Sequence, residues 1–346
     1  MHTPTTVPTK VAIVGVTGYA GGELARILLR HPEARLVAAV ARGKQGVPLR
    51  DVQPHLHAAP ESLVVGSDVG DAEVVFTALP AGEAAKLASA WLAEGRTIVD
   101  IGSDFRLREP SAYERWYGYR HPAPQLLAQA VYGLTEFVRD RLRGARLVAN
   151  PGCYPTASLL ALGPAARHGL IESDVIVDAK SGVSGAGHSV DEAYLYGTID
   201  ESVRAYGVPT HRHTPEIAQG LADLGTRSPR LTFAPHLVPM TRGLIATCYA
   251  TLRPNVTAGE VAEAYAHEYA EEPFVRVTAS FPPTKATLGS NWCLVHATVD
   301  EANHRLVAVG VLDNLVKGAA GSAVQNMNAA LGLPETLGLE ALPLWP

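Results

Sequence analysis

One cysteine lies between turn-forming residues and an apolar helix, a position that suits a nucleophile. Asn150-Pro151-Gly152 is typical of a turn, and Pro155 fits the first turn of a helix because its missing N–H needs no partner there. We therefore expect Cys153 on a tight loop just before the N-terminus of a helix that continues through the apolar stretch of residues 157–166. The positive end of such a helix lowers the pKa of a thiol. The alternative is a buried structural cysteine.

Two histidines flank Arg212 and provide a second chemical signal. Thr214 can cap a helix with Pro215 at its first position, which would place His213 just outside the helix. A helix N-terminus disfavours the imidazolium, so His213 would stay neutral and able to accept a proton. His211 is the alternative for this role, and Arg212 could contact an anionic substrate.

A glycine-rich segment near the N-terminus indicates a dinucleotide site. It follows a short apolar strand and opens a helix, so its glycines allow a tight turn with the helix N-terminus facing a pyrophosphate. The alternative is a simple tight turn. The expected cofactor contacts are Gly15, Thr17, Gly18, Tyr19, Ala20 and Gly21.

The end of the second strand predicts which dinucleotide is bound. NAD-binding proteins usually carry an acidic residue there for the ribose 2′-OH. This chain has Arg42 and Lys44 instead, which suit a 2′-phosphate. We therefore expect NADP(H) rather than NAD; the alternative is a pair of solvated surface cations.

Two further loops offer ligand contacts. Residues 180–187 are small and hydroxyl-rich, so Ser181 and Gly182 could contact phosphate or nicotinamide, although a flexible loop fits equally well. Arg242 supplies another cation for an anionic substrate or else lies in a surface turn. A reactive thiol beside a nicotinamide cofactor indicates aldehyde or acyl chemistry through a covalent intermediate.

Two different patterns of strands and helices, one before Cys153 and one after it, would position these residues. The first 150 residues alternate strands and helices, which predicts an α/β, Rossmann-type doubly wound parallel sheet. After Cys153 the strands are longer and the helices fewer, which predicts an α+β catalytic domain with a mainly antiparallel or mixed sheet. The strands expected there cover residues 174–179, 231–238, 244–252, 292–299 and 306–312.

Composition excludes several functional classes. A length of 346 residues suggests about two domains, and a net charge of -5 without a basic run argues against nucleic acid as a partner. No apolar stretch could span a bilayer, and the N-terminus lacks the apolar core of a signal peptide. We therefore expect no membrane partner. The three cysteines have neither disulfide nor metal-ligand spacing, so we also expect no bound metal and a protein of the reducing cytoplasm.

Together these motifs resemble the N-acetyl-γ-glutamyl-phosphate reductase family over nearly the whole chain. The markers are residues 15–23, 100–106, 150–156, 180–187, 211–217 and 313–318. The resemblance implies a fold like that of aspartate-semialdehyde dehydrogenase, with residues 1–150 and 314–346 binding NADP. Residues 151–313 would form the catalytic and oligomerisation domain of a homo-oligomer, a dimer or tetramer. It also implies that Asn314 lies near the nicotinamide.

The resemblance implies NADPH-dependent reduction of a small acyl phosphate in arginine biosynthesis. Cys153 would form a thioacyl intermediate, and His213, or else His211, would transfer the proton. A backbone N–H near Cys153 would stabilise the oxyanion. The substrate contacts expected on this basis are Arg106, Asn150, Ser184, Arg212 and Arg242.

Two other functions fit parts of the sequence. One is the aminoadipyl-phosphate reductase of carrier-protein-dependent lysine biosynthesis, a group that often departs from the patterns at residues 150–155 and 180–187; this chain keeps both. The other is a non-catalytic dinucleotide-binding regulator, against which the presence of Cys153 and both histidines argues.

Overall fold

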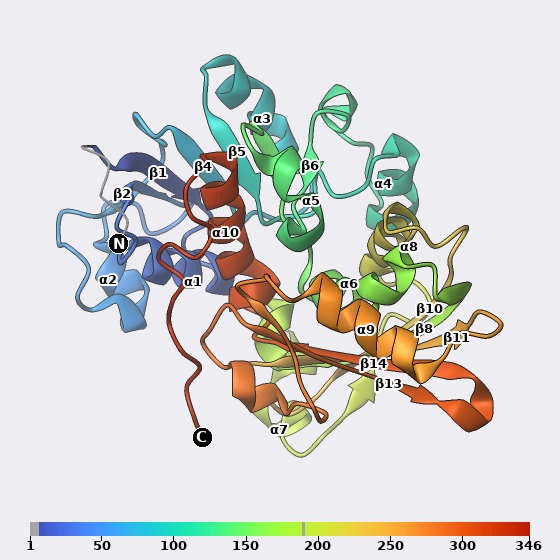
Figure 1. The fold of residues 1–346 in the computed structure, drawn as a ribbon. Helices are drawn as coiled ribbons and strands as arrows, with labels where there is room; N and C mark the ends of the chain where they lie inside the picture. Colours follow the sequence, from blue (N-terminus) through green and yellow to red (C-terminus); the bar gives the residue numbers. More distant parts are fainter. Residues whose placement is uncertain (1–6, 189–190) are drawn as a thin grey trace. The chain divides into compact units, whose positions relative to one another are not determined.

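The computed structural model describes residues 7–188 and 191–346, which divide into two compact units (Figure 1). The first comprises Met1–Pro151 with Ala319–Ala341, and the second Gly152–Gly318 with Leu342–Pro346. The chain thus returns to the first unit at Ala319, whereas the sequence interpretation placed this return at 314. The last five residues are largely exposed and contact the second unit, where the Leu344 N–H donates to the Leu288 carbonyl at 2.9 Å.

The first unit contains a seven-stranded sheet in the order β3-β2-β1-β4-β5-β7-β6. All neighbouring strands are parallel, as the alternation of strands and helices predicted. The order reverses between β1 and β4, and such a point opens a crevice at the carboxyl ends of the strands. The strands are β1 Thr9–Val14, β2 Ala34–Val40, β3 Val65–Gly66, β4 Val74–Thr77, β5 Thr97–Asp100, β6 Val131–Tyr132 and β7 Leu147–Ala149.

Helices pack on this sheet through apolar faces. The helices of this unit are α1 Tyr19–Leu28, α2 Leu49–Val52, α3 Ala84–Ala93, α4 Pro110–Tyr117, α5 Thr135–Leu142 and α10 Gly321–Ala330. Every residue of α10 is buried, and it lies against α1, α5 and β5. Its polar side chains are satisfied internally, since Asn326 donates to the Gly133 carbonyl and to the Asn150 side chain, both at 2.9 Å.

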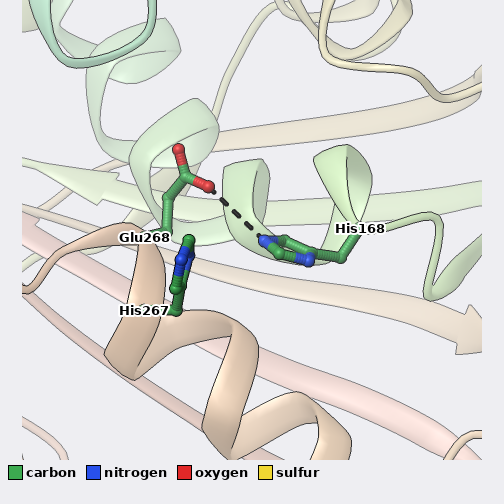
Figure 2. A group of neighbouring side chains, drawn as sticks. All are labelled: His168, His267 and Glu268. Carbon is green, nitrogen blue, oxygen red and sulfur yellow. Dashed lines mark ion pairs between the residues drawn. The ribbon is translucent and has the colours of Figure 1, made fainter.

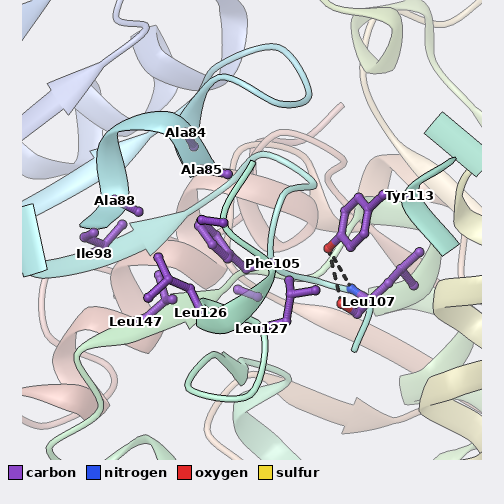
Figure 3. Close-up of a cluster of buried hydrophobic side chains, with 12 residues drawn as sticks. Ala84, Ala85, Ala88, Ile98, Phe105, Leu107, Tyr113, Leu126, Leu127 and Leu147 are labelled. Atoms are coloured by element: carbon purple, nitrogen blue, oxygen red, sulfur yellow. Dashed lines mark hydrogen bonds between the residues drawn. The ribbon is translucent and has the colours of Figure 1, made fainter. Parts of the chain in front are cut away.

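A buried cluster supports the loop that follows β5 (Figure 3). Small side chains of α3, among them Ala84 and Ala88, make room for Phe105. The Tyr113 hydroxyl accepts from the Leu107 N–H at 3.1 Å and lies 3.3 Å from the Leu107 carbonyl. These contacts hold residues 101–107 against the sheet.

The second unit has a mixed seven-stranded sheet, as predicted, in the order β12-β13-β14-β11-β8-β10-β9. The pairs β8–β10 and β12–β13 are parallel, and the other neighbours are antiparallel. The strands are β8 Ile171–Ser181, β9 Arg204–Ala205, β10 Arg230–Leu237, β11 Leu244–Leu252, β12 Val275–Val277, β13 Cys293–Asp300 and β14 Arg305–Leu312.

One long helix forms the centre of this unit. The helices are α6 Cys153–Arg167, α7 Tyr196–Ile199, α8 His213–Asp223 and α9 Ala258–Glu268. Helix α6 is almost wholly buried and packs on β11 and β14. It approaches β14 so closely that a Cβ at Gly310 would lie 2.4 Å from the Ala157 carbonyl oxygen. Among the described residues, we find no helix whose length and apolar character would let it cross a membrane.

Candidate active site

A cavity of about 520 Å³ in the second unit gathers most of the reactive residues predicted from the sequence. Cys153, both histidines and Arg212 line it together with Ser181 and Gly182. These residues come from the start of α6, the end of β8 and the start of α8. The other lining residues are Tyr154, Gly185, Ala186, Tyr194, Arg204, Tyr206, Thr210 and Leu237.

Cys153 is the first residue of α6 rather than the last residue of a preceding loop. Gly152 is the N-cap, with extended dihedral angles (φ −69°, ψ 158°), so the helix begins one residue earlier than the turn signals indicated. The thiol is half-buried at the positive end of a fifteen-residue helix. Gly318 lies against it, since a Cβ there would be 2.7 Å from the Cys153 Cβ.

A buried carboxylate that the sequence interpretation did not single out holds this turn. Glu216 is fully buried on α8, and its Oε1 accepts the Gly152 N–H at 2.8 Å. The helix that carries His213 is thereby tied to the N-terminus of the helix that carries Cys153. The only sequence signal was an acidic residue in the first turn of α8, which is normally explained by the helix dipole.

The N-terminus of α8 differs from the predicted arrangement. The helix begins at His213 with Arg212 as N-cap, so Thr214 is not the cap. The His211 ring takes that role, because its Nδ1 accepts the His213 N–H at 3.0 Å, and its carbonyl accepts the Thr214 N–H at 2.9 Å. The ring and the backbone carbonyl of His211 thus each satisfy one of the first N–H groups of the helix.

This contact distinguishes the two histidines. With Nδ1 accepting a backbone N–H, a neutral His211 carries its proton on Nε2 and can donate only from there. Burial, with a smaller contribution from the Arg212 charge, lowers the pKa of His211 to about 4. His211 is therefore neutral at pH 7. The His213 ring lies 4.9 Å away, centroid to centroid.

Two tyrosines complete the wall of the cavity, and the sequence interpretation missed both. The Tyr206 hydroxyl donates to the Tyr154 hydroxyl, which donates to the His236 carbonyl, each at 3.2 Å. Burial raises the pKa of Tyr206 to about 12 and that of Tyr154 still further. Both hydroxyls are therefore protonated at pH 7. Tyr154 also stacks edge-on against His211 and His213.

Some of the predicted cations and loop residues line this cavity, whereas others make contacts elsewhere in the second unit. Arg212 lines the cavity, and so does Arg204, which sequence reasoning missed. The Arg242 Nη1 instead lies 3.4 Å from the buried Asp313 carboxylate. Asn314 donates to the Ser184 hydroxyl at 2.9 Å and accepts the Gly243 N–H at 2.8 Å. Asn314 thus links the loop after β8 to the loop before β11.

A second cavity, of about 710 Å³, lies in the first unit at the carboxyl ends of β1, β2 and β4. Gly15, Thr17 and Gly18 line it, and α1 begins directly afterwards at Tyr19. A side chain at Gly15, where φ is +101°, would put its Cβ 2.3 Å from the Ala78 carbonyl oxygen. A Cβ at Gly21 would lie 2.2 Å from the Gly15 oxygen. The turn is thus a backbone cradle that fits a dinucleotide pyrophosphate.

The two basic residues expected beside the ribose differ in position. Arg42 is at the rim of this cavity, largely exposed, and ion-paired with Glu83. Lys44 lies two residues further along in a left-handed conformation (φ 66°) and is not among the described residues that line the cavity.

The other two candidate substrate contacts belong to the first unit. Arg106 is buried, and its Nη2 donates to the Ile101 carbonyl at 2.8 Å. Its charge opposes the burial that raises the pKa of Asp100 to about 6. The Asn150 amide donates to the Ala319 carbonyl at 3.2 Å. Their contacts with substrate stay predictions.

Comparison with known proteins places the chain in the semialdehyde dehydrogenase class. The family "Semialdehyde dehydrogenase, NAD binding domain" matches residues 10–145, and "Semialdehyde dehydrogenase, dimerisation domain" matches residues 153–314. An aspartate semialdehyde dehydrogenase II from Vibrio cholerae shares the fold, with a TM-score of 0.71 and 17% identity over 94% of this chain and 98% of that one. The enzyme from Candida albicans, solved with NADP, has a TM-score of 0.67 at 15% identity, covering 93% and 98%.

Sequence relatives narrow the class. N-acetyl-gamma-glutamyl-phosphate reductase of Dehalococcoides mccartyi is 50% identical over 97% of this chain and 99% of the relative. The protein of the same name from Symbiobacterium thermophilum is 49% identical with the same coverage. The chain therefore belongs to the N-acetyl-gamma-glutamyl-phosphate reductase family, as its motifs indicated. It is an oxidoreductase that uses NADP(H).

Proposed function

We propose that this chain reduces N-acetyl-γ-glutamyl phosphate to N-acetylglutamate 5-semialdehyde and phosphate, a step of arginine biosynthesis. The observation that carries the proposal is the joint lining of one cavity by Cys153, His211, Arg212 and His213 in a member of this family. The first unit would bind NADP(H), and the second would carry the catalytic residues and the contacts of a cytoplasmic homo-oligomer.

The Cys153 thiolate attacks the acyl carbon, the bond from that carbon to the phosphate oxygen breaks, and phosphate leaves with the bonding electrons. The product of this step is a thioester on Cys153. When bound, NADPH supplies the hydride that reduces the thioester carbon. The first turn of α6 is where backbone donors would stabilise the oxyanion that forms in both steps. Collapse of the second oxyanion releases the aldehyde and restores the thiolate.

We assign proton transfer to His213 and a positioning role to His211. His211 uses Nδ1 to hold the start of α8, and its low pKa makes it a poor base at pH 7. His213 takes the proton of the thiol before attack. Arg212 and Arg204 bind the anionic groups of the substrate, since both line the cavity. Glu216 positions Cys153 through the Gly152 N–H.

The reverse reaction provides the test. The purified protein is mixed with NADP⁺, phosphate and N-acetylglutamate 5-semialdehyde, and NADPH formation is followed by its absorbance. Rapid, phosphate-dependent formation is expected. Absence of NADPH would contradict the proposal, and faster turnover of the aminoadipate analogue would assign the chain to the other substrate class.

A further inference from the structure

A cluster of three potential metal ligands lies outside both cavities, on the surface of the second unit. His168 is the C-cap of α6, while His267 and Glu268 are the last two residues of α9. Figure 2 shows the two imidazole rings gathered around the Glu268 carboxylate. One ligand atom of each residue lies within 4.8 Å of the other two. His168 is far from the other two residues in the sequence, so their spacing gave no metal signal there.

We propose that His168, His267 and Glu268 form a binding site for a divalent late transition-metal ion such as Zn²⁺. Two imidazoles and one carboxylate are a donor set that zinc accepts, with water in the fourth position. Imidazole nitrogen also selects against Mg²⁺ and Ca²⁺, which prefer oxygen ligands.

The distances require little rearrangement. Ligands about 2.0–2.2 Å from a tetrahedral Zn²⁺ are about 3.4 Å from one another. The His168 Nε2 and the Glu268 Oε2 are already 3.5 Å apart. The His267 ring must approach by at most about 1.4 Å, which its exposed side chain can do by rotation.

The helix ends favour a cation, and a neighbouring arginine, whose own charge opposes one, holds the carboxylate ligand in place. The cluster lies at the C-terminal ends of two helices, where the helix dipoles are negative. The Arg167 Nη1 donates to the Glu268 Oε1 at 2.7 Å, which fixes the carboxylate with its other oxygen toward His168. Helices α6 and α9 are already bound together, since the Tyr265 hydroxyl donates to the Ala161 carbonyl at 2.5 Å. An ion would therefore tie together two helix ends whose backbones are already held in place.

The test uses full-length, metal-free Cys153→Ser protein, so that the active-site thiol does not compete for zinc. Calorimetric titration with ZnCl₂ should show one ion per chain, and Zn²⁺ should raise the unfolding temperature by mass action. His168→Ala, His267→Ala and Glu268→Gln should each weaken this binding more than about 10-fold, since loss of a direct ligand should cost at least as much as loss of an outer-shell partner. Excess Mg²⁺ should not displace the zinc.

His57→Ala is the matched control, because His57 is an exposed histidine of the other unit, and it should bind Zn²⁺ like the parent protein. In the wild-type background the three ligand variants should keep reductase activity, which shows that they are folded. Equal zinc binding in all variants, no zinc uptake, or displacement by Mg²⁺ would each overturn the proposal.

Discussion

The two cavities are built on different principles. The cavity of the first unit is shaped by backbone, with glycines at positions where any side chain would collide with a carbonyl oxygen. The cavity of the second unit is lined by a thiol, two imidazoles, three phenols and two guanidinium groups from four segments of the chain. A cofactor common to many enzymes can be held by a local turn, whereas substrate chemistry needs side chains that only the folded unit brings together.

The largest expected effect concerns the thiol. Cys153→Ser should reduce kcat by more than about 10⁴-fold, comparable to loss of the nucleophile in a serine protease, because serine is a far weaker nucleophile at neutral pH. Steady-state kinetics measures this loss, and fluorescence titration should show unchanged NADPH binding. Substantial residual turnover would place the nucleophile elsewhere. Loss of NADPH binding would remove the distinction between the two cavities.

The histidines test the division of roles within the catalytic cavity. His213→Asn should lower kcat by roughly 10²–10⁴-fold, the range for loss of a general acid–base group. His211→Asn should cost less, because the asparagine oxygen can still accept the His213 N–H. A larger loss in the His211 variant would reverse the assignment.

The partly buried His211 ring should also make the folding stability of the protein depend on pH. The folded-state pKa of His211, about 4, lies below its ordinary value, so the unfolded chain binds more protons as pH falls through 6.5. Stability from the neutral ring is complete above about pH 6.5 and is lost toward pH 4. Urea unfolding at pH 7 and pH 4.5 should show a smaller drop for His211→Asn than for the wild type; equal drops would contradict the burial argument.

The affinity for NADPH should depend on the backbone conformation of the glycine turn that lines the first cavity. Gly15→Ala forces a side chain into a left-handed position and against the Ala78 oxygen, so NADPH affinity should fall by about 100-fold or more, equivalent to about 3 kcal/mol of strain and misplacement. Gly43→Ala is the control, because Gly43 has a negative φ and a Cβ there would meet no other atom within 4 Å. Fluorescence titration compares them, and equal affinity in the two variants would show that the turn does not bind the cofactor.

The smallest effect concerns the choice of dinucleotide. Arg42→Ala should raise the KM for NADPH about 10-fold, the equivalent of one exposed charge contact worth about 1.4 kcal/mol, and should change the KM for NADH little. The effect is modest because Arg42 is largely exposed and shares its charge with Glu83. Equal changes for both cofactors would remove Arg42 from the 2′-phosphate site.

Local patterns predicted much of the fold. The alternation of strands and helices indicated the parallel sheet, and the longer strands after Cys153 indicated the mixed one. The capping box at Thr257 and Glu260 shows how local such a pattern is, because its two reciprocal hydrogen bonds involve residues three apart. At α8 the local pattern was wrong, because the His211 ring, outside the Thr-Pro-Glu pattern, provided the cap.

The sequence alone indicated a thiol at a helix N-terminus, a glycine turn after a strand, a His-Arg-His segment and the family to which they belong. Each is a relation between near neighbours in the chain, where turn and helix preferences act directly. Only the tertiary structure brought Tyr154, Tyr206 and Arg204 to the same cavity and placed the Glu216 carboxylate on the turn before Cys153. It also gathered His168, His267 and Glu268 at two helix ends. Such contacts join distant segments, and their distances depend on how helices and strands pack rather than on any local preference.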